Sequence, residues 1–114
     1  MDLSAATRIE PDDTVVLAFT GVLDLETIGA AEAAFADAEE REPKRVVVDL
    51  SDVEFIDSTG LRLIVSADAR IRRDGRRLEL VKGPDRVHRV FRMTLMNERL
   101  TFIDHAPGDP TTPA

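Results

Sequence analysis

One short segment of the chain combines a hydroxyl group with an acid and a glycine. The residues Asp57-Ser58-Thr59-Gly60 lie between an apolar run and a segment with helical periodicity. A serine that acts as a nucleophile needs a base within hydrogen-bonding reach, and that base needs an orienting group. The two histidines, His88 and His105, stand in no motif that would bring them to Ser58, and a Gly-x-Ser-x-Gly segment is absent. We therefore expect no hydrolase chemistry at Ser58.

The same four residues also have a purely structural explanation. Serine and aspartate side chains at a helix start accept hydrogen bonds from the backbone amides of the first turn. Gly60 would let that turn pack closely against neighbouring backbone. From these residues alone, a capping role is the favoured explanation of Ser58, and a role of its own for the hydroxyl is the alternative.

Composition excludes several classes of function. The chain has 114 residues, of which 43% are hydrophobic and 32% are charged, as is typical of one soluble globular domain. Five phenylalanines without tryptophan or tyrosine, together with a net charge of -7, disfavour a nucleic-acid partner. The sequence contains no cysteine, no Walker-type loop and no His-acid pair at ligand spacing. We therefore expect no metal and no cofactor.

The chain lacks the signals of export and membrane insertion. The start, Met1-Asp2-Leu3-Ser4, is not a basic segment followed by an apolar stretch. No apolar run approaches the roughly 20 residues that a membrane span requires. We expect a cytoplasmic protein without a membrane partner.

Segments typical of strands and helices alternate along the chain. Strands are expected at about 7–10, 15–20, 46–50, 78–81 and 101–103. Helices are expected at about 26–40, at 58–73 and after Gly83-Pro84-Asp85. Gly21 is expected to end the second strand, Asp24 to lie at or before the cap of the first helix, and Gly75 to stop the second helix.

This alternation predicts an α/β fold with helices packed on a sheet. The run from Val46 to Leu50 is almost continuously apolar, which is typical of a strand covered on both faces. We expect one domain over residues 1–106. Residues 107–114 are polar and contain proline, so they are expected to form a flexible tail.

The second expected helix has one apolar face and two residues that do not fit it. The face consists of Leu61, Ile64, Val65 and Ile71. Asp68 falls in the middle of this face, and Leu63 falls outside it. In one interpretation, Asp68 pairs with Arg72 at a frayed margin and Leu63 is simply exposed. In the other, Leu63 belongs to a docking patch beside Ser58.

Two segments carry a resemblance to a known family. Gly21-Val22-Leu23-Asp24 and the run from Val46 to Leu61 are similar to the STAS domain, and most closely to free-standing bacterial anti-sigma factor antagonists. The likeness extends from about Thr7 to Asp104. It implies a small mixed sheet of four to five strands, with helices mainly on one side and no catalysis by the domain itself.

The resemblance also implies a phosphorylation switch that regulates transcription. In such antagonists, the serine that matches Ser58 is phosphorylated by an anti-sigma factor of the serine-kinase type. The unphosphorylated antagonist captures this factor and frees the sigma factor. ATP then belongs to the partner, and a PP2C-like phosphatase is the implied enzyme that resets Ser58. Asp24 and Asp57 match aspartates that support recognition or phosphorylation.

A partner-binding surface follows from this resemblance. Its candidate residues are Asp24, Asp57, Ser58, Thr59, Gly60, Arg62 and Leu63. Thr59 offers a second hydroxyl as an alternative phosphate acceptor. Phosphorylation adds about -1.5 to -2 charges. We expect the amides and the dipole of a helix N-terminus to tolerate this charge, so that its cost falls on the interface rather than on the fold.

The chain departs from the family pattern at two places, and a second function remains open. Val22 stands where the family usually has an acid. The segment Thr94-Leu95-Met96 stands where relatives have Thr-Gly-Leu, so Leu95 is predicted either to alter this loop or to extend the preceding helix. The alternative function is a constitutive scaffold or complex subunit, of the stressosome or lipid-transport type, in which Ser58 is only a helix cap.

Overall fold

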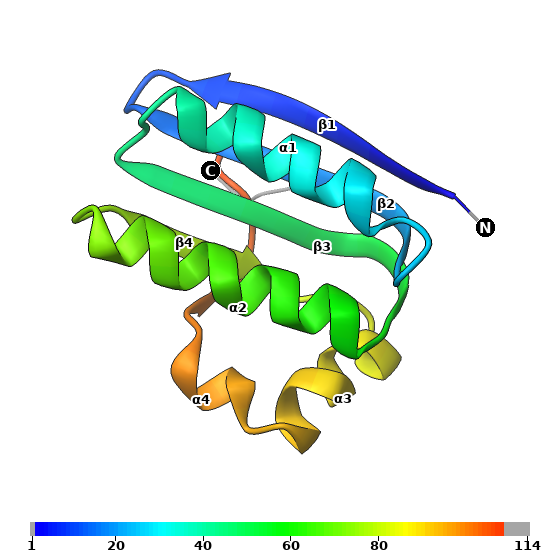
Figure 1. Ribbon diagram of the computed structural model, residues 1–114. Coiled ribbons are helices and arrows are strands. Elements are labelled where there is room, and N and C mark those ends of the chain that lie inside the picture. Colours follow the sequence, from blue (N-terminus) through cyan, green and yellow to red (C-terminus); the bar gives the residue numbers. More distant parts are fainter. Residues whose placement is uncertain (1, 109–114) are drawn as a thin grey trace.

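The computed structural model describes residues 2–108 (Figure 1). The strands are β1 (Leu3–Glu10), β2 (Thr14–Leu23), β3 (Arg45–Ile56), β4 (Arg77–Val81) and β5 (Phe102–Ile103). The helices are α1 (Ile28–Glu40), α2 (Ser58–Arg73), α3 (Asp85–Met93) and α4 (Met96–Arg99). The predicted order of the five strands and of the helices α1, α2 and α3 is confirmed, whereas α4 is a helix that the sequence does not predict. Most of the predicted tail, residues 109–114, lies outside the described residues.

The strands form one mixed sheet in the order β1-β2-β3-β4-β5. β1 is antiparallel to β2, and the other neighbours are parallel. Helices α1 and α2 lie side by side on one face of the sheet, and α3 and α4 follow beyond α2 (Figure 1). The predicted α/β fold with helices mainly on one side is confirmed.

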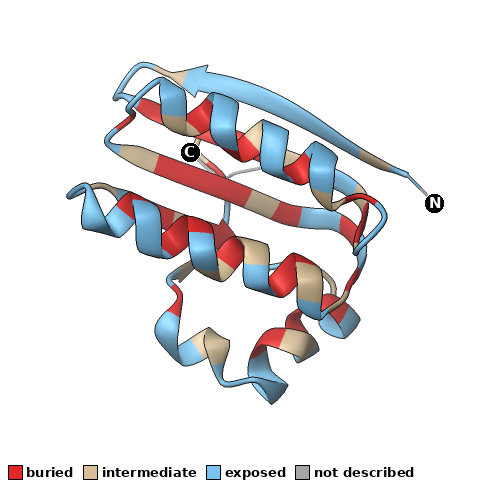
Figure 2. Cartoon of the chain, in the orientation of Figure 1, coloured by how far each residue is buried: buried red, intermediate tan, exposed pale blue. Residues whose placement is uncertain are grey.

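β3 is the centre of the core, as its apolar run predicts (Figure 2). Val46, Val48 and Leu50 are buried on the helix side of the sheet, in the larger apolar cluster. Val47 is buried in a smaller cluster with Val16, Val81 and Ala106. The segment after β5 therefore covers part of the face that the helices leave open.

Several strands run further than the sequence predicts. β1 begins at Leu3 rather than near Thr7, because its whole length pairs with β2. Gly21 does not end β2: it has a φ of 111° and lies where the β2–β3 register shifts, so that β2 continues for two more residues. β3 continues to Ile56, paired with β2 alone, where the sequence predicts a loop.

The bounds of α2 agree with the prediction, and its last turn is followed by Gly75 at a φ of 77°. Asp68 is only 9% exposed, and its Oδ1 atom accepts a hydrogen bond from Arg72 Nε at 3.0 Å. The predicted pairing is thus confirmed, but Asp68 lies at a nearly covered position and not at a frayed margin. The ion pair explains how an acid can occupy the apolar face.

His88 is buried, whereas the sequence suggests a surface position. Its side chain on α3 has its ring centroid 6.2 Å from that of Phe91 and 4.8 Å from that of Phe102, and its Nδ1 atom is buried without a hydrogen-bond partner. Burial lowers the pKa of His88, and the positive charges of Lys82 and Arg92 act in the same direction. We conclude that this histidine serves the packing of α3 against β5 in its neutral form.

Leu95 connects α3 to α4 in a strained conformation. It has φ 62° and ψ 15°, the left-handed region that favours glycine, and its residue surface is 60% exposed. Leu95 therefore does not extend α3. The turn that a glycine would permit is kept, with a leucine in it, and the left-handed conformation costs a residue with a Cβ atom roughly 1–2 kcal/mol.

Leu95→Gly is expected to raise the free energy of unfolding by about 1 kcal/mol, because glycine removes this strain. Denaturant unfolding of the purified chain measures the effect. Met93→Gly is the matched control, since Met93 is also exposed but lies in a right-handed helix, where glycine should lower stability. A similar decrease in the free energy of unfolding in Leu95→Gly and Met93→Gly would contradict the strain at Leu95.

Candidate functional site

Ser58 is the first residue of α2. The start of this helix lies at the carboxyl ends of β2 and β3 (Figure 1). These strands are parallel and end together, with Leu23 paired to Ile56. The loop from β2 to α1 and the junction from β3 to α2 therefore meet at one edge of the sheet. Ser58 is exposed there, and its hydroxyl forms no hydrogen bond with any residue of the range 2–108.

Asp57 is the cap of α2. Its Oδ1 atom accepts hydrogen bonds from the amides of Thr59 at 2.9 Å and Gly60 at 3.0 Å. Its Oδ2 atom accepts one from the amide of Leu25 at 3.3 Å, in the loop that follows β2. One carboxylate thus fixes the start of α2 and joins it to that loop. The cap explanation is correct for Asp57 and wrong for Ser58.

Asp57→Ala is expected to lower the free energy of unfolding by about 1–2 kcal/mol, since first-turn amides lose their acceptor. Ser58→Ala should change it by less than about 0.5 kcal/mol, because its side chain is exposed and bonds to nothing in the described chain. Paired chemical denaturation curves compare the two. A loss of 1 kcal/mol or more in Ser58→Ala would show that Ser58 also caps the helix.

Asp24 shapes the loop between β2 and α1. Its Oδ1 atom accepts hydrogen bonds from the amides of Glu26 at 3.0 Å and Thr27 at 3.1 Å, so the predicted position before the helix cap is confirmed. The Thr27 hydroxyl in turn donates to the Val22 carbonyl at 2.7 Å. Val22 itself is 1% exposed, which suits the apolar residue found there.

Gly60 allows the close packing that its sequence position predicts. A Cβ atom at Gly60 would lie 2.7 Å from the carbonyl oxygen of Leu23 and 3.0 Å from Ile56 Cγ1. The first turn of α2 therefore rests directly on the end of β2. Gly60 is buried and sets the distance between the two segments that flank Ser58.

Arg62 and Leu63 fall on different sides of α2. Arg62 is exposed and lies one turn after Ser58, on the same side of the helix. Leu63 is rotated by about 140° from Ser58 about the helix axis. It is half-buried and borders a hollow of about 310 Å³ whose other lining residues are Glu32, Ala36, Glu39 and Arg70. Leu63 is therefore neither simply exposed nor part of a patch beside Ser58.

Two large apolar residues near Ser58, which the sequence pattern does not single out, are exposed. Leu25, whose amide bonds to Asp57, is 70% exposed, and Phe55 near the end of β3 is 50% exposed. Part of the end of β3 is coloured as exposed in Figure 2. The outward position of Phe55 follows from the register shift between Gly21 and Val22, and no local sequence pattern predicts this shift.

We call Leu25, Phe55, Ser58 and Arg62 the Ser58 surface. Asp57 directly precedes Ser58, Asp24 directly precedes Leu25, and Arg62 adds a positive charge. The amides of Thr59 and Gly60 already donate to Asp57, so they are less available to a phosphate than the sequence suggests. A phosphate on Ser58 would thus face solvent or a partner.

The site lacks the groups of a catalytic serine. The ring of His88 is packed between α3 and β5, and His105 is exposed beyond β5. In the described chain, three or more His, Cys, Asp or Glu side chains do not gather into a group able to hold a metal ion. Across residues 2–108, no helix combines the length and apolar character needed to cross a membrane.

Comparisons with known proteins agree with this geometry. Residues 6–103 match the family described as "Mlab, STAS domain". The anti-sigma-F factor antagonist RsfB of Mycobacterium tuberculosis is 33% identical over 70 residues, which are 61% of this chain and 57% of RsfB. The match thus spans less than two thirds of that relative's own length.

Three solved structures of two proteins share the fold. An anti-sigma factor antagonist from Mycobacterium paratuberculosis superposes with a TM-score of 0.82 at 21% identity, over 90% of this chain and 86% of the other. The unphosphorylated antagonist SpoIIAA gives 0.73 at 18% identity, over 88% of each chain. SpoIIAA, a Bacillus cell fate determinant, also has a structure in its phosphorylated form, with a TM-score of 0.67 at 17% identity over 88% and 91%. With its family match over residues 6–103, this chain belongs to the STAS-domain family and resembles anti-sigma factor antagonists.

Proposed function

We propose that the protein is an anti-sigma factor antagonist controlled by phosphorylation of Ser58. Unphosphorylated, it binds an anti-sigma factor of the serine-kinase type through the Ser58 surface and frees the sigma factor. Phosphorylated, it releases that partner. The relatives support the class of partner, because RsfB is named an anti-sigma-F factor antagonist.

The observation that carries this proposal is the state of the Ser58 hydroxyl. It is exposed at the start of α2 and bonds to no residue in the described chain, and the adjoining segments carry the exposed side chains of Leu25 and Phe55. Leu25 and Phe55 give a partner apolar surface to cover, which is the usual core of a protein interface. A kinase could reach this hydroxyl without unfolding any element.

The geometry also supports a switch without refolding. A phosphate on Ser58 would add about -1.5 to -2 charges beside Asp57 and Asp24. Because Asp57 already caps α2, the fold does not depend on the Ser58 side chain. The new charge would instead be placed inside the partner interface, where like charge and desolvation cost several kcal/mol. Phosphorylation of Ser58 is therefore expected to weaken binding of the partner without lowering the stability of the fold.

Phosphorylation is tested with a cognate kinase-type anti-sigma factor, ATP and mass spectrometry of the intact chain and its peptides. One phosphate on Ser58 is expected, none in Ser58→Ala, and the normal amount in Thr59→Ala. Thr59 is half-buried, so it is the poorer acceptor. A chain that takes up no phosphate, or takes it only on Thr59, would contradict the proposed switch.

The alternative of a constitutive scaffold rests on Ser58 acting only as a helix cap. Asp57 makes the capping hydrogen bonds instead, so this alternative leaves the exposed Ser58 hydroxyl without a role. A PP2C-like phosphatase completes the proposed cycle, because a released antagonist must lose its phosphate to act again.

A further inference from the structure

The end of α2 opposite Ser58 carries an unusual concentration of positive charge. Residues 70–77 contain five arginines and one acid, in a chain with 15 Lys and Arg and 22 Asp and Glu. This cluster lies roughly 24 Å along α2 from Ser58, given 1.5 Å per residue. Like charges repel when they gather, unless counter-charges or a ligand offset them.

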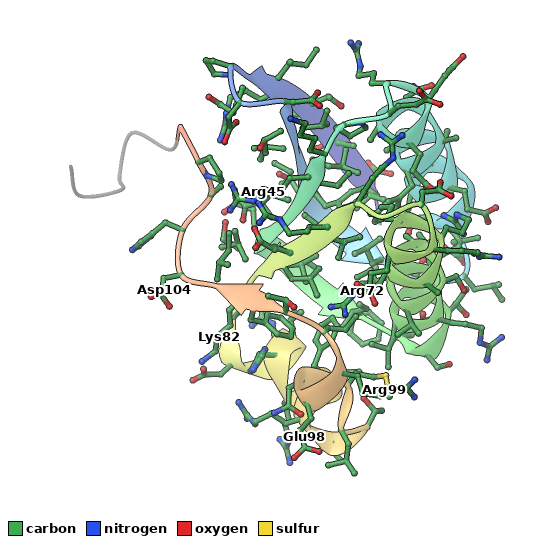
Figure 3. All side chains as sticks on the ribbon, turned by 90° about the vertical axis from the view of Figure 1, so that its left-hand side faces the viewer. Arg45, Arg72, Lys82, Glu98, Arg99 and Asp104 are labelled. Carbon is green, nitrogen blue, oxygen red and sulfur yellow. The ribbon has the colours of Figure 1, made fainter. Side chains whose placement is uncertain are left out.

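Part of this cluster surrounds a hollow of about 270 Å³ at the open edge of β4. Figure 3 looks onto this end of α2 and labels Arg72. The lining residues are Arg72, Arg76, Arg77, Leu78, Glu79 and Thr101. The hollow exists because β5 pairs with β4 only at Leu80 and Val81, so the first half of β4 has no strand beside it there.

Two of the lining arginines are held in place by other groups. Arg72 donates from Nε to Asp68 at 3.0 Å and from Nη2 to the Thr101 hydroxyl at 3.1 Å. Arg76 donates from Nη1 to the carbonyl of Pro43 at 3.0 Å. Each guanidinium has five N–H donors, so both retain donors for a ligand. Their fixed positions reduce the entropy that binding would cost.

Arg77 provides the charge that the chain itself leaves unused. It is exposed and forms no ion pair or side-chain hydrogen bond with residues 2–108. Glu79 also borders the hollow, but its Oε1 atom accepts from Arg45 Nε, so its charge is balanced. Arg72 pairs with Asp68, and Arg76 Nη2 lies 4.0 Å from Glu42 Oε2, so the excess positive charge of the lining comes from Arg77.

The backbone closes one side of this hollow. The amide of Leu80 donates to the carbonyl of Thr101 at 2.8 Å. Leu78 lies beyond the end of the β5 pairing and borders the hollow, but it is only 1% exposed. The donors that a ligand could reach are therefore those of the arginine side chains.

We propose that this hollow binds the phosphate groups of a small, multiply charged phosphorylated molecule. Arginines from α2, the following turn and β4 line one hollow, and their guanidinium donors suit the several oxygens of a phosphate. The site lies away from the Ser58 surface and does not depend on the function proposed there. Ligand and partner protein could therefore be bound together.

The test is isothermal titration of the full chain with inorganic pyrophosphate, at an ionic strength held constant with sodium chloride. Saturable binding with one site is expected. Arg77→Ala should weaken it at least about tenfold, since a charged hydrogen bond is lost. Arg73→Ala is the matched control: it removes the same charge from an exposed arginine that does not line the hollow, and should weaken binding less than about threefold.

Three results would overturn the proposal. These are the absence of saturable pyrophosphate binding, equal losses in Arg77→Ala and Arg73→Ala, or loss of binding in Ser58→Asp, which would locate the ligand at the other end of α2. Circular dichroism of each variant establishes that it is folded. Failure of the Ser58 switch leaves this test unaffected, because the titration involves no partner protein.

Discussion

Ser58→Asp is expected to weaken the complex with the anti-sigma factor at least about 100-fold, whereas Ser58→Ala should bind within about threefold of the wild type. The aspartate places a negative charge beside Asp57 and Asp24 in the centre of the proposed interface. Like-charge contact and desolvation there cost several kcal/mol, and 2.8 kcal/mol corresponds to about 100-fold. Surface plasmon resonance with the immobilised anti-sigma factor measures the dissociation constants of both variants.

The control for this prediction adds the same charge to the same helix. Ser66 is exposed on α2, two turns beyond Ser58, so Ser66→Asp should bind within about threefold of the wild type. The stability of Ser58→Asp should also stay within about 0.5 kcal/mol, because an acid in the first turn suits the helix dipole. Equal binding by Ser58→Asp and the wild type would refute the switch, even if Ser58 proved to be phosphorylated.

Gly60→Ala is expected to lower the free energy of unfolding by about 2–3 kcal/mol. The added Cβ atom would lie 2.7 Å from the Leu23 carbonyl oxygen, and backbone cannot move aside cheaply. Relief of the clash requires α2 to move away from the end of β2, which would also displace Ser58 from the β2–α1 loop. Partner binding should therefore fall together with stability.

Gly29→Ala makes the same substitution in α1 and should have the opposite sign. Nothing lies within 4 Å of a Cβ atom built at Gly29, and its φ is not in the left-handed region. Alanine is expected to stabilise this exposed helical position by about 0.5–1 kcal/mol. Thermal unfolding followed by circular dichroism compares the two variants. An equal loss of stability in Gly29→Ala and Gly60→Ala would contradict the role of the Gly60 contact, because the same substitution would then destabilise without any clash.

The sequence predicts α2 and the first half of β3 well for identifiable reasons. The periodicity of Leu61, Ile64 and Ile71, with Asp57 before and Gly75 after, marks a helix at both ends. The apolar run from Val46 to Leu50 predicts a strand that is buried on both faces of the sheet. These signals are local, because they arise from side-chain spacing and from residues with restricted backbone preferences. The resemblance of the segment around Ser58 similarly depends only on neighbouring residues.

Other features depend on contacts between distant segments. β3 continues to Ile56 because β2 pairs with it, and His88 is buried because Phe102 of β5 packs against it. The predicted one-domain extent, residues 1–106, remains a prediction. No local pattern reports such pairings, since their energy comes from residues far away in the chain.

By itself, the sequence determined the order of the strands and of the first three helices, the start of α2 at Ser58 and the family resemblance, because each is encoded in adjacent residues. The tertiary structure alone decided that Asp57 and not Ser58 caps the helix, that Leu25 and Phe55 are exposed, and that Leu63 borders a hollow beside α1. It also brought three arginines to the open edge of β4. The physical reason is that capping partners, exposure and charge convergence depend on which segments meet in space.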